Sequence, residues 1–129
     1  EHMDGRRLFR THWLPVLAYV ALIFTLSAQP GLHVPGEFEY RDKFAHLLEY
    51  GGLGWLTYRA ARSTWPQAAF VRRALLAAVM VSALGASDEL FQSRIPGRDS
   101  SVYDWAADSL GVSLAQLLGV TLDKRRRVV

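Results

Sequence analysis

Apolar residues gather in four stretches, and polar connections separate them. The pattern predicts helices at about residues 10–29, 43–60, 72–92 and 102–122. One of the five prolines, Pro15, is expected in the first turn of the first helix, where proline is tolerated. The other prolines fall in the connections, where helices should break: Pro30, Pro35, Pro66 and Pro96.

The stretches reach about 20 residues when their polar ends are included, which is the length that a helix needs to cross a bilayer. Gly111, Ala115 and Gly119 recur every four residues on the fourth stretch, and small residues at this spacing let helices approach closely in lipid. The predicted fold is therefore all-α, a four-helix transmembrane bundle. Residues 1–3 resemble the remnant of an expression tag, and residues 4–129 are expected to form a single domain.

Lys and Arg residues are distributed unequally among the connections and the two ends of the chain. If the N-terminus lies inside and the connections alternate, 11 of the 15 Lys and Arg residues lie inside. Cytoplasmic loops of membrane proteins carry such an excess, whereas a soluble four-helix bundle has no reason to sort its charges. Both ends of the chain are thus predicted to be cytoplasmic. The basic tail at 124–127 would otherwise suggest nucleic acid, but here it is expected to lie against membrane lipids, with no nucleic-acid partner.

Acidic residues are sorted the other way, and nine of the 12 fall in the outer half. Ionisable residues at membrane depth are costly and by default face a protein interior or a water-filled cavity. Helical spacing brings the polar positions of three stretches to a similar depth in the outer leaflet. One polar pocket is expected there, roofed by residues 93–101, and its members are Asp42, His46, Glu49, Tyr50, Asp88, Glu89, Gln92, Asp104 and Asp108.

Some of these positions have a purely structural interpretation. Ser101 and Asp104 lie near a helix N-terminus, where a hydroxyl or a carboxylate caps the helix. Asp42 and Lys43 could form an interfacial ion pair. His46 alone would be a structural group, but beside several carboxylates it becomes a candidate base or metal ligand. No cysteine is present, so a thiolate metal site is excluded.

Two motifs resemble those of the VanZ-like family. DKFAHLLEYGGLGWL at 42–56 resembles its Asp-Lys-x-x-His-x-x-x-Tyr-x-x-Leu-Gly signature, and DELFQSRIPGRDSSVYDWAADSLG at 88–111 resembles its second signature. LSAQP at 26–30 is similar to the usual end of its first helix. Asp108 stands where such proteins commonly have Asn, and this extra carboxylate would either strengthen cation binding or raise the pKa of a neighbouring group.

The resemblance implies a multi-pass protein of the bacterial cytoplasmic membrane, in a family whose founding member is associated with teicoplanin resistance. The distribution of basic residues predicts that the site faces the extracytoplasmic side. The catalytic candidates are His46, Glu49, Asp88 and Asp104. The substrate-binding candidates are Lys43, Tyr50, Gln92, Arg98 and Ser101. The candidate metal ligands are Asp42, His46, Asp88, Glu89, Asp104 and Asp108.

The leading hypothesis is an envelope protein that acts on, or binds, a lipid-linked component or cell-wall precursor. If it is an enzyme, it would be a hydrolase or transferase on a lipid head group, with Lys43 and Arg98 holding an anion. A carboxylate cluster suits Mg²⁺, Ca²⁺ or Mn²⁺, and Zn²⁺ if His46 is a ligand. The alternative is a non-catalytic lipid-binding or scaffold protein whose polar cluster is structural. An ion-coupled transporter is disfavoured, because the inner half offers few ionisable residues for a path.

Overall fold

The computed structural model describes residues 3–30, 41–98 and 100–128, all of whose regular elements are helical. The first helix runs from Gly5 to Ser27 and comprises α1 (Gly5–Leu8), a π-helical turn η1 (Phe9–Trp13) and α2 (Leu14–Ser27). It is followed by α3 (Arg41–Thr64), α4 (Phe70–Gln92) and α5 (Val102–Val128). The predicted all-α four-helix architecture is confirmed. Glu1 and His2, in the predicted tag remnant, lie outside the described residues.

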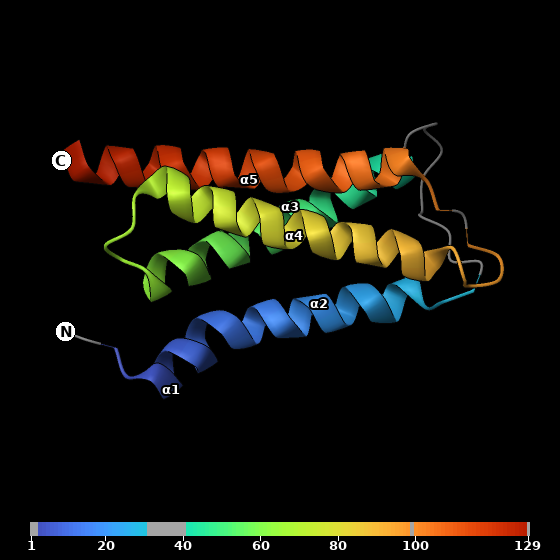
Figure 1. Cartoon of the computed structure of the whole chain (residues 1–129), viewed down its shortest axis with the longest axis horizontal. Helices are drawn as coiled ribbons and strands as arrows, with labels where there is room; N and C mark the ends of the chain where they lie inside the picture. The colour runs from blue at the N-terminus through green and yellow to red at the C-terminus, as the bar shows by residue number, and fades with distance from the viewer. Residues whose placement is uncertain (1–2, 31–40, 99, 129) are drawn as a thin grey trace.

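The helices run side by side as a bundle whose two ends differ (Figure 1). The N- and C-terminal ends of the chain lie at one end, together with the connection between α3 and α4. The connection between α4 and α5 lies at the other end. Both termini can lie on the same side of a membrane, as predicted, only if the chain crosses it an even number of times. Which side carries the termini stays a prediction.

The helical run begins at Gly5, five residues before its predicted start, while Pro15 lies in the first turn of α2, as predicted. Proline has no backbone N–H, so Pro15 leaves the Thr11 carbonyl without its usual helical partner. The guanidinium of Arg59 on α3 donates to that carbonyl at 2.7 Å. The wider π-helical turn lies immediately before the proline, and such a turn is a common way for a helix to absorb a local disruption.

Two other helices are longer than predicted. α3 continues to Thr64 and α5 to Val128, about four and six residues past their expected ends. The basic tail therefore belongs to α5. Lys and Arg are good helix formers, and positive charge near a helix C-terminus is stabilised by the helix dipole, so the charged tail extends the helix.

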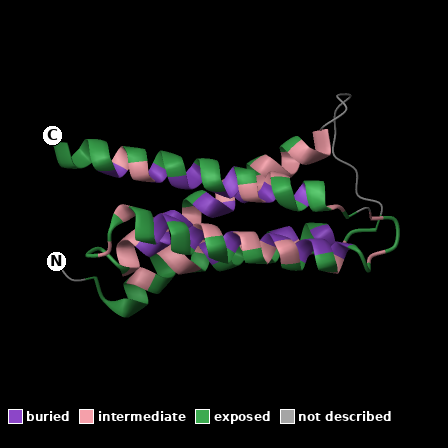
Figure 2. Cartoon of the chain, turned by 45° about the horizontal axis from the view of Figure 1, so that its top comes forward, coloured by how far each residue is buried: buried purple, intermediate pink, exposed green. Residues whose placement is uncertain are grey.

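The core lies where α3 packs against α5 and α4 (Figure 2). Gly111 lets the backbones of α3 and α5 approach closely, because a Cβ atom there would lie 2.2 Å from the carbonyl oxygen of Leu47. Gly119 likewise makes room for the ring of Tyr58. Leu53 and Val112 are fully buried beside these contacts. The predicted packing role of the small residues on α5 is confirmed.

The outside of the bundle is strongly apolar. Large aliphatic side chains such as Val79, Leu90 and Leu117 are about two-thirds exposed. Three of the described helices, Gly5–Ser27, Phe70–Gln92 and Val102–Val128, are long and apolar enough to cross a membrane. Apolar surface on this scale belongs in lipid rather than in water, so the protein is membrane-embedded. α3 is less apolar because it packs against the other helices and carries much of the polar cluster.

Candidate functional site

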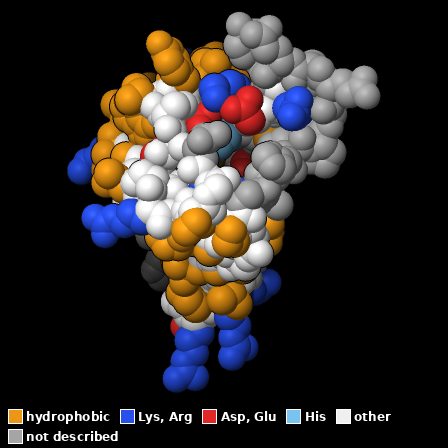
Figure 3. All heavy atoms as spheres, turned by 90° about the vertical axis from the view of Figure 1, so that its right-hand side faces the viewer, with side chains coloured by type: hydrophobic (Ala, Val, Ile, Leu, Met, Phe, Trp, Pro, Cys, Tyr) orange, Lys and Arg blue, Asp and Glu red, His pale blue; other side chains and the backbone are white. Residues whose placement is uncertain are grey.

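Acidic and basic side chains gather at the end of the bundle that carries the α4–α5 connection (Figure 3). They come from the first two turns of α3, the last two turns of α4 and the first two turns of α5. Polar residues of three helices therefore meet here, as helical spacing predicted.

Three side chains from three different helices converge at its centre. Nδ1 of His46 lies 2.7 Å from Oδ1 of Asp108 and 3.8 Å from Oε1 of Glu89. The candidate ligand atoms of this trio all lie within 4.8 Å of one another. Ligand atoms around one divalent ion lie about 2.0–2.6 Å from it, so they are no more than about 5 Å apart. The trio therefore meets the geometric requirement for a shared metal ion.

Carboxylate oxygens at the centre lack partners. Asp88 and Asp108 are at most 1% exposed, yet Oδ1 of Asp88 and Oδ2 of Asp108 accept no hydrogen bond from the described residues. Oε1 of Glu89 is likewise buried and unpartnered. A buried charged oxygen without a partner is costly, and protons or a cation would remove that cost.

Asp88 is held in place by its neighbours. The hydroxyl of Tyr50, which is fully buried, donates to Oδ2 of Asp88 at 2.9 Å. The amide of Gln92 donates to the same oxygen at 3.4 Å and to Oγ of Ser27 at 3.1 Å. Tyr50 and Gln92 thus orient Asp88 and connect it to the first helix. Ser27 was not among the predicted residues, because a single serine at a helix end carries no distinctive pattern.

Lys43 binds two carboxylates that differ in their exposure to solvent. Its Nζ lies 2.6 Å from Oδ2 of Asp42 and 2.7 Å from Oδ1 of Asp104. The Asp42 side chain is 48% exposed, whereas that of Asp104 is 7% exposed. The interfacial pair of Asp42 and Lys43 is therefore present, and Lys43 also ties α3 to α5. Both carboxylates lie outside the central trio, so of the six predicted metal ligands only three meet closely enough to share an ion.

The connection between α4 and α5 closes the cluster. Ile95–Arg98 forms a turn with a hydrogen bond from the Arg98 N–H to the Ile95 carbonyl, and Gly97 takes the positive φ of 76° that a type II turn needs after proline. Oγ of Ser101 then accepts from the backbone N–H of Asp104, which confirms the predicted N-cap. The backbone N–H of Ser101 donates to Oε2 of Glu89. Ser101 therefore orients Glu89 as well as starting α5.

Arg98 and Glu49 lie at the edge of the cluster. Glu49 lines a groove of about 350 Å³ between α2 and α3, together with apolar side chains such as Ile23 and Leu48. Arg98 lies within electrostatic range of Glu49. Helical spacing placed Glu49 on the same face as His46, and the two lie within electrostatic range of each other. Glu49 also borders the first helix, where Tyr19 donates to its backbone carbonyl at 2.7 Å.

A second buried polar group lies at the opposite end and was not predicted. Tyr58 donates to Oδ2 of Asp123 at 2.6 Å, and Nε of Arg62 lies 3.3 Å from the other carboxylate oxygen. Asp123 is 5% exposed. Its separation from Tyr58 by 65 residues hides the pairing in the sequence. The signal that could have indicated it is an acid, Asp123, directly before the basic residues 124–127.

No family model, curated protein or solved structure matches this chain. The resemblance to the VanZ-like family therefore stays a prediction that rests on the two motifs. Those motifs contain the residues that the structure brings together, since His46, Glu89 and Asp104 fall within them.

Proposed function

We propose that this protein is a VanZ-like membrane protein of the bacterial envelope, whose cluster binds a divalent cation on the extracytoplasmic side. The observation that supports this most directly is the convergence of His46, Glu89 and Asp108 within 4.8 Å around unpartnered carboxylate oxygens. The cation would then engage the phosphate of a lipid-linked component or cell-wall precursor. The proposal includes a role in resistance to a glycopeptide antibiotic such as teicoplanin.

The donor set favours particular ions. Two carboxylates and one imidazole suit Mn²⁺ or Zn²⁺ better than Ca²⁺ or Mg²⁺, which prefer oxygen ligands throughout. His46 and Asp108 are at hydrogen-bond distance, 2.7 Å, so a proton lies between them when no ion is bound. Binding of an ion would displace that proton, and affinity should fall at acidic pH.

Hydrolysis or transfer at a phosphate is promoted by a cation and by a group that holds the phosphate in place. The cation would neutralise phosphate charge and activate a water molecule. Arg98 is the substrate-binding candidate whose guanidinium makes no ion pair within the described part of the chain, so it is suited to hold the phosphate. Lys43, in contrast, is already engaged by two carboxylates. This arrangement would serve a hydrolase or transferase acting on a lipid head group.

Metal retention tests the proposal. After purification and removal of loosely bound ions, the wild-type protein should retain Mn²⁺ or Zn²⁺ near one per chain by elemental analysis. We expect Asp108→Asn and His46→Gln to weaken the affinity for Mn²⁺ at least tenfold in calorimetric titrations, since loss of even an outer-shell partner costs about 10–100-fold. Both substitutions preserve side-chain volume approximately, which limits structural damage.

Asp42→Asn is the matched control. It also removes one carboxylate, but that carboxylate is half exposed and lies outside the trio. It should leave the Mn²⁺ affinity within about twofold of the wild-type value. Equal losses in Asp42→Asn and Asp108→Asn would show nonspecific attraction to acidic groups. A wild-type protein that binds none of the four ions would contradict the proposal.

The non-catalytic alternative is favoured by one observation. Most members of the cluster bind one another: Tyr50 with Asp88, Lys43 with Asp104, and Ser101 with Glu89. A purely structural cluster would predict that Asp108→Asn lowers the free energy of unfolding while no ion changes the stability of the wild-type protein. A cation site predicts that Mn²⁺ raises the midpoint of thermal unfolding.

The orientation is tested by labelling. The chain contains no cysteine, so an introduced cysteine reports on one position without background. Cysteine in the variant Arg98→Cys should react with a membrane-impermeant maleimide added to intact cells. Cysteine in Arg126→Cys, at the opposite end of the bundle, should react only after lysis. The reverse pattern would show that the cluster faces the cytoplasm.

A further inference from the structure

The end of the bundle that carries both termini holds an unusual helix start. α4 begins after Ala69, which provides no side-chain cap, and no acidic residue occurs in its first turn. The first backbone N–H groups of a helix carry partial positive charge and lack intrahelical acceptors. Arg72 and Arg73 add two cations to this same turn. Among the described residues, neither the N-cap position nor the first turn of α4 therefore supplies a negative group that would stabilise this helix start.

The buried guanidinium of Arg73 indicates that an anion is missing from this helix start. Arg73 is only 3% exposed, and its Nε has no hydrogen-bond partner. Its Cζ lies 5.2 Å from the ring centroid of Phe70, the first residue of α4, and Cζ of Arg127 lies 4.3 Å from the same centroid. Within the described chain, no carboxylate pairs with either guanidinium. Two cations on one ring repel each other, and an anion beside them would offset both the repulsion and the burial of Arg73.

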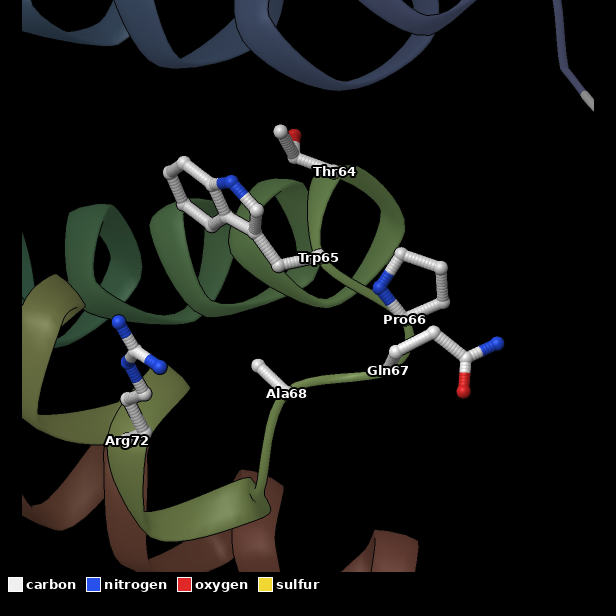
Figure 4. A pocket seen from close by; sticks show the side chains of 6 residues that line it. All are labelled: Thr64, Trp65, Pro66, Gln67, Ala68 and Arg72. Carbon is white, nitrogen blue, oxygen red and sulfur yellow. The ribbon is translucent and has the colours of Figure 1, made fainter.

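The surroundings indicate which kind of anion fits. A hollow of about 470 Å³ lies next to this turn and is lined by residues 64–68 and by Arg72, but not by Phe70, Arg73 or Arg127 (Figure 4). The ring of Trp65 packs edge-on against Trp13, and tryptophan is enriched at the head-group level of membranes. Val71 and Leu75, which follow along α4, are 57% and 61% exposed. An anionic group followed directly by an apolar surface matches a phosphate with acyl chains.

We propose that the start of α4, with Arg73, Arg127 and Phe70, binds the phosphate of an anionic phospholipid. The phosphate accepts hydrogen bonds from the uncapped N–H groups and from the two guanidiniums. The acyl chains lie along the exposed aliphatic side chains of α4. This site is at the other end of the bundle from the cation cluster and does not depend on the proposed function.

Lipid binding to the delipidated full-length protein tests the proposal. Native mass spectrometry would measure the affinity for dioleoylphosphatidylglycerol, with dioleoylphosphatidylcholine and inorganic phosphate as separate arms. We expect Arg127→Ala and Arg73→Ala each to weaken phosphatidylglycerol binding roughly fivefold or more, which is the effect of one basic residue at a lipid surface. Arg126→Ala is the matched control, because it removes the same charge from the same exposed tail without touching Phe70.

The outcomes separate the alternatives. Weakening in Arg127→Ala but not in Arg126→Ala supports the site, and this comparison decides alone if Arg73→Ala does not fold. Equal weakening in both tail variants would show diffuse attraction and overturn the proposal. Equal affinity for phosphatidylcholine would show that only the apolar surface binds lipid. Displacement of phosphatidylglycerol by an equal concentration of inorganic phosphate would assign the site to a free anion instead.

Discussion

Gly111→Ala is expected to separate α5 from α3 and to lower the free energy of unfolding by about 3 kcal/mol or more, at the upper end of what overpacking costs. The added Cβ would lie 2.2 Å from the Leu47 carbonyl oxygen and 3.0 Å from the Gly51 nitrogen. Both atoms belong to the backbone of α3, so no side-chain rotation can relieve the overlap. Relief requires movement of a whole helix, which would also disturb the neighbouring core contacts.

Gly51→Ala is the control for this substitution. It adds the same methyl group at the same helix–helix contact, but its nearest atom is the Gly111 carbonyl oxygen at 3.5 Å, an ordinary contact distance. Its effect should stay within about 1 kcal/mol, because alanine also favours the helix over glycine by about that amount. Reversible unfolding in mixed detergent micelles, followed by circular dichroism, would measure both. Equal destabilisation by the two variants would contradict the close approach at Gly111.

The same substitution should affect the cluster. Asp108 precedes Gly111 by one helical turn, and its Oδ1 lies 2.7 Å from Nδ1 of His46 on α3. Displacement of α5 would lengthen this contact and disperse the trio. Gly111→Ala is thus expected to lose metal affinity without removing any ligand, whereas Gly51→Ala should retain it.

Lys43→Met has the second largest expected effect, a loss of about 3 kcal/mol in the free energy of unfolding, at the low end for breaking a buried ion pair. The reason is the Asp104 carboxylate, whose side chain is 7% exposed and which would lose its cation. Methionine keeps most of the lysine side-chain volume, so the lost charge dominates. The low end applies because Lys43 itself is 32% exposed and water can partly replace it.

Two further variants isolate this effect. Asp42→Asn removes the other partner of Lys43, but Asp42 is half exposed, so the loss should stay below about 1 kcal/mol. The double variant Lys43→Met/Asp104→Asn should recover much of the stability lost in Lys43→Met, because it removes the unpaired charge. The same unfolding experiment measures all three. A double variant that is less stable than Lys43→Met would show that Asp104 stabilises the fold through contacts other than the ion pair.

The local parts of the cluster could be predicted because they depend on neighbours in sequence. Ser101 caps α5 through a residue three positions later, and Pro96–Gly97 turns the chain through its own backbone preferences. Residues four apart on a helix share a face, so Asp88 and Gln92 were expected together and do hydrogen-bond. These features need no knowledge of how the helices pack.

The pairings between helices could not be predicted in the same way. Asp88, Glu89 and Asp108 were all plausible partners for His46, and the rotation of α4 and α5 decides that Asp108 and Glu89 face it. The same rotation turns Asp88 toward Tyr50 and Gln92 toward Ser27. A helix rotates by about 100° per residue, so adjacent carboxylates diverge and small differences in packing select between them.

The sequence by itself determined that this chain forms four helices with an apolar exterior, that four of its five prolines lie in the connections, and that most of its acidic residues gather toward one end. These features depend on residues that are close together in the chain, so the apolar pattern, the prolines and the charges indicate them directly. Only the tertiary structure decided which carboxylates contact His46, that Lys43 is already paired, and that Arg73 is buried without a carboxylate partner among the described residues. Those outcomes depend on close contacts between distant residues, such as Gly111 against Leu47, whose distances no local pattern encodes.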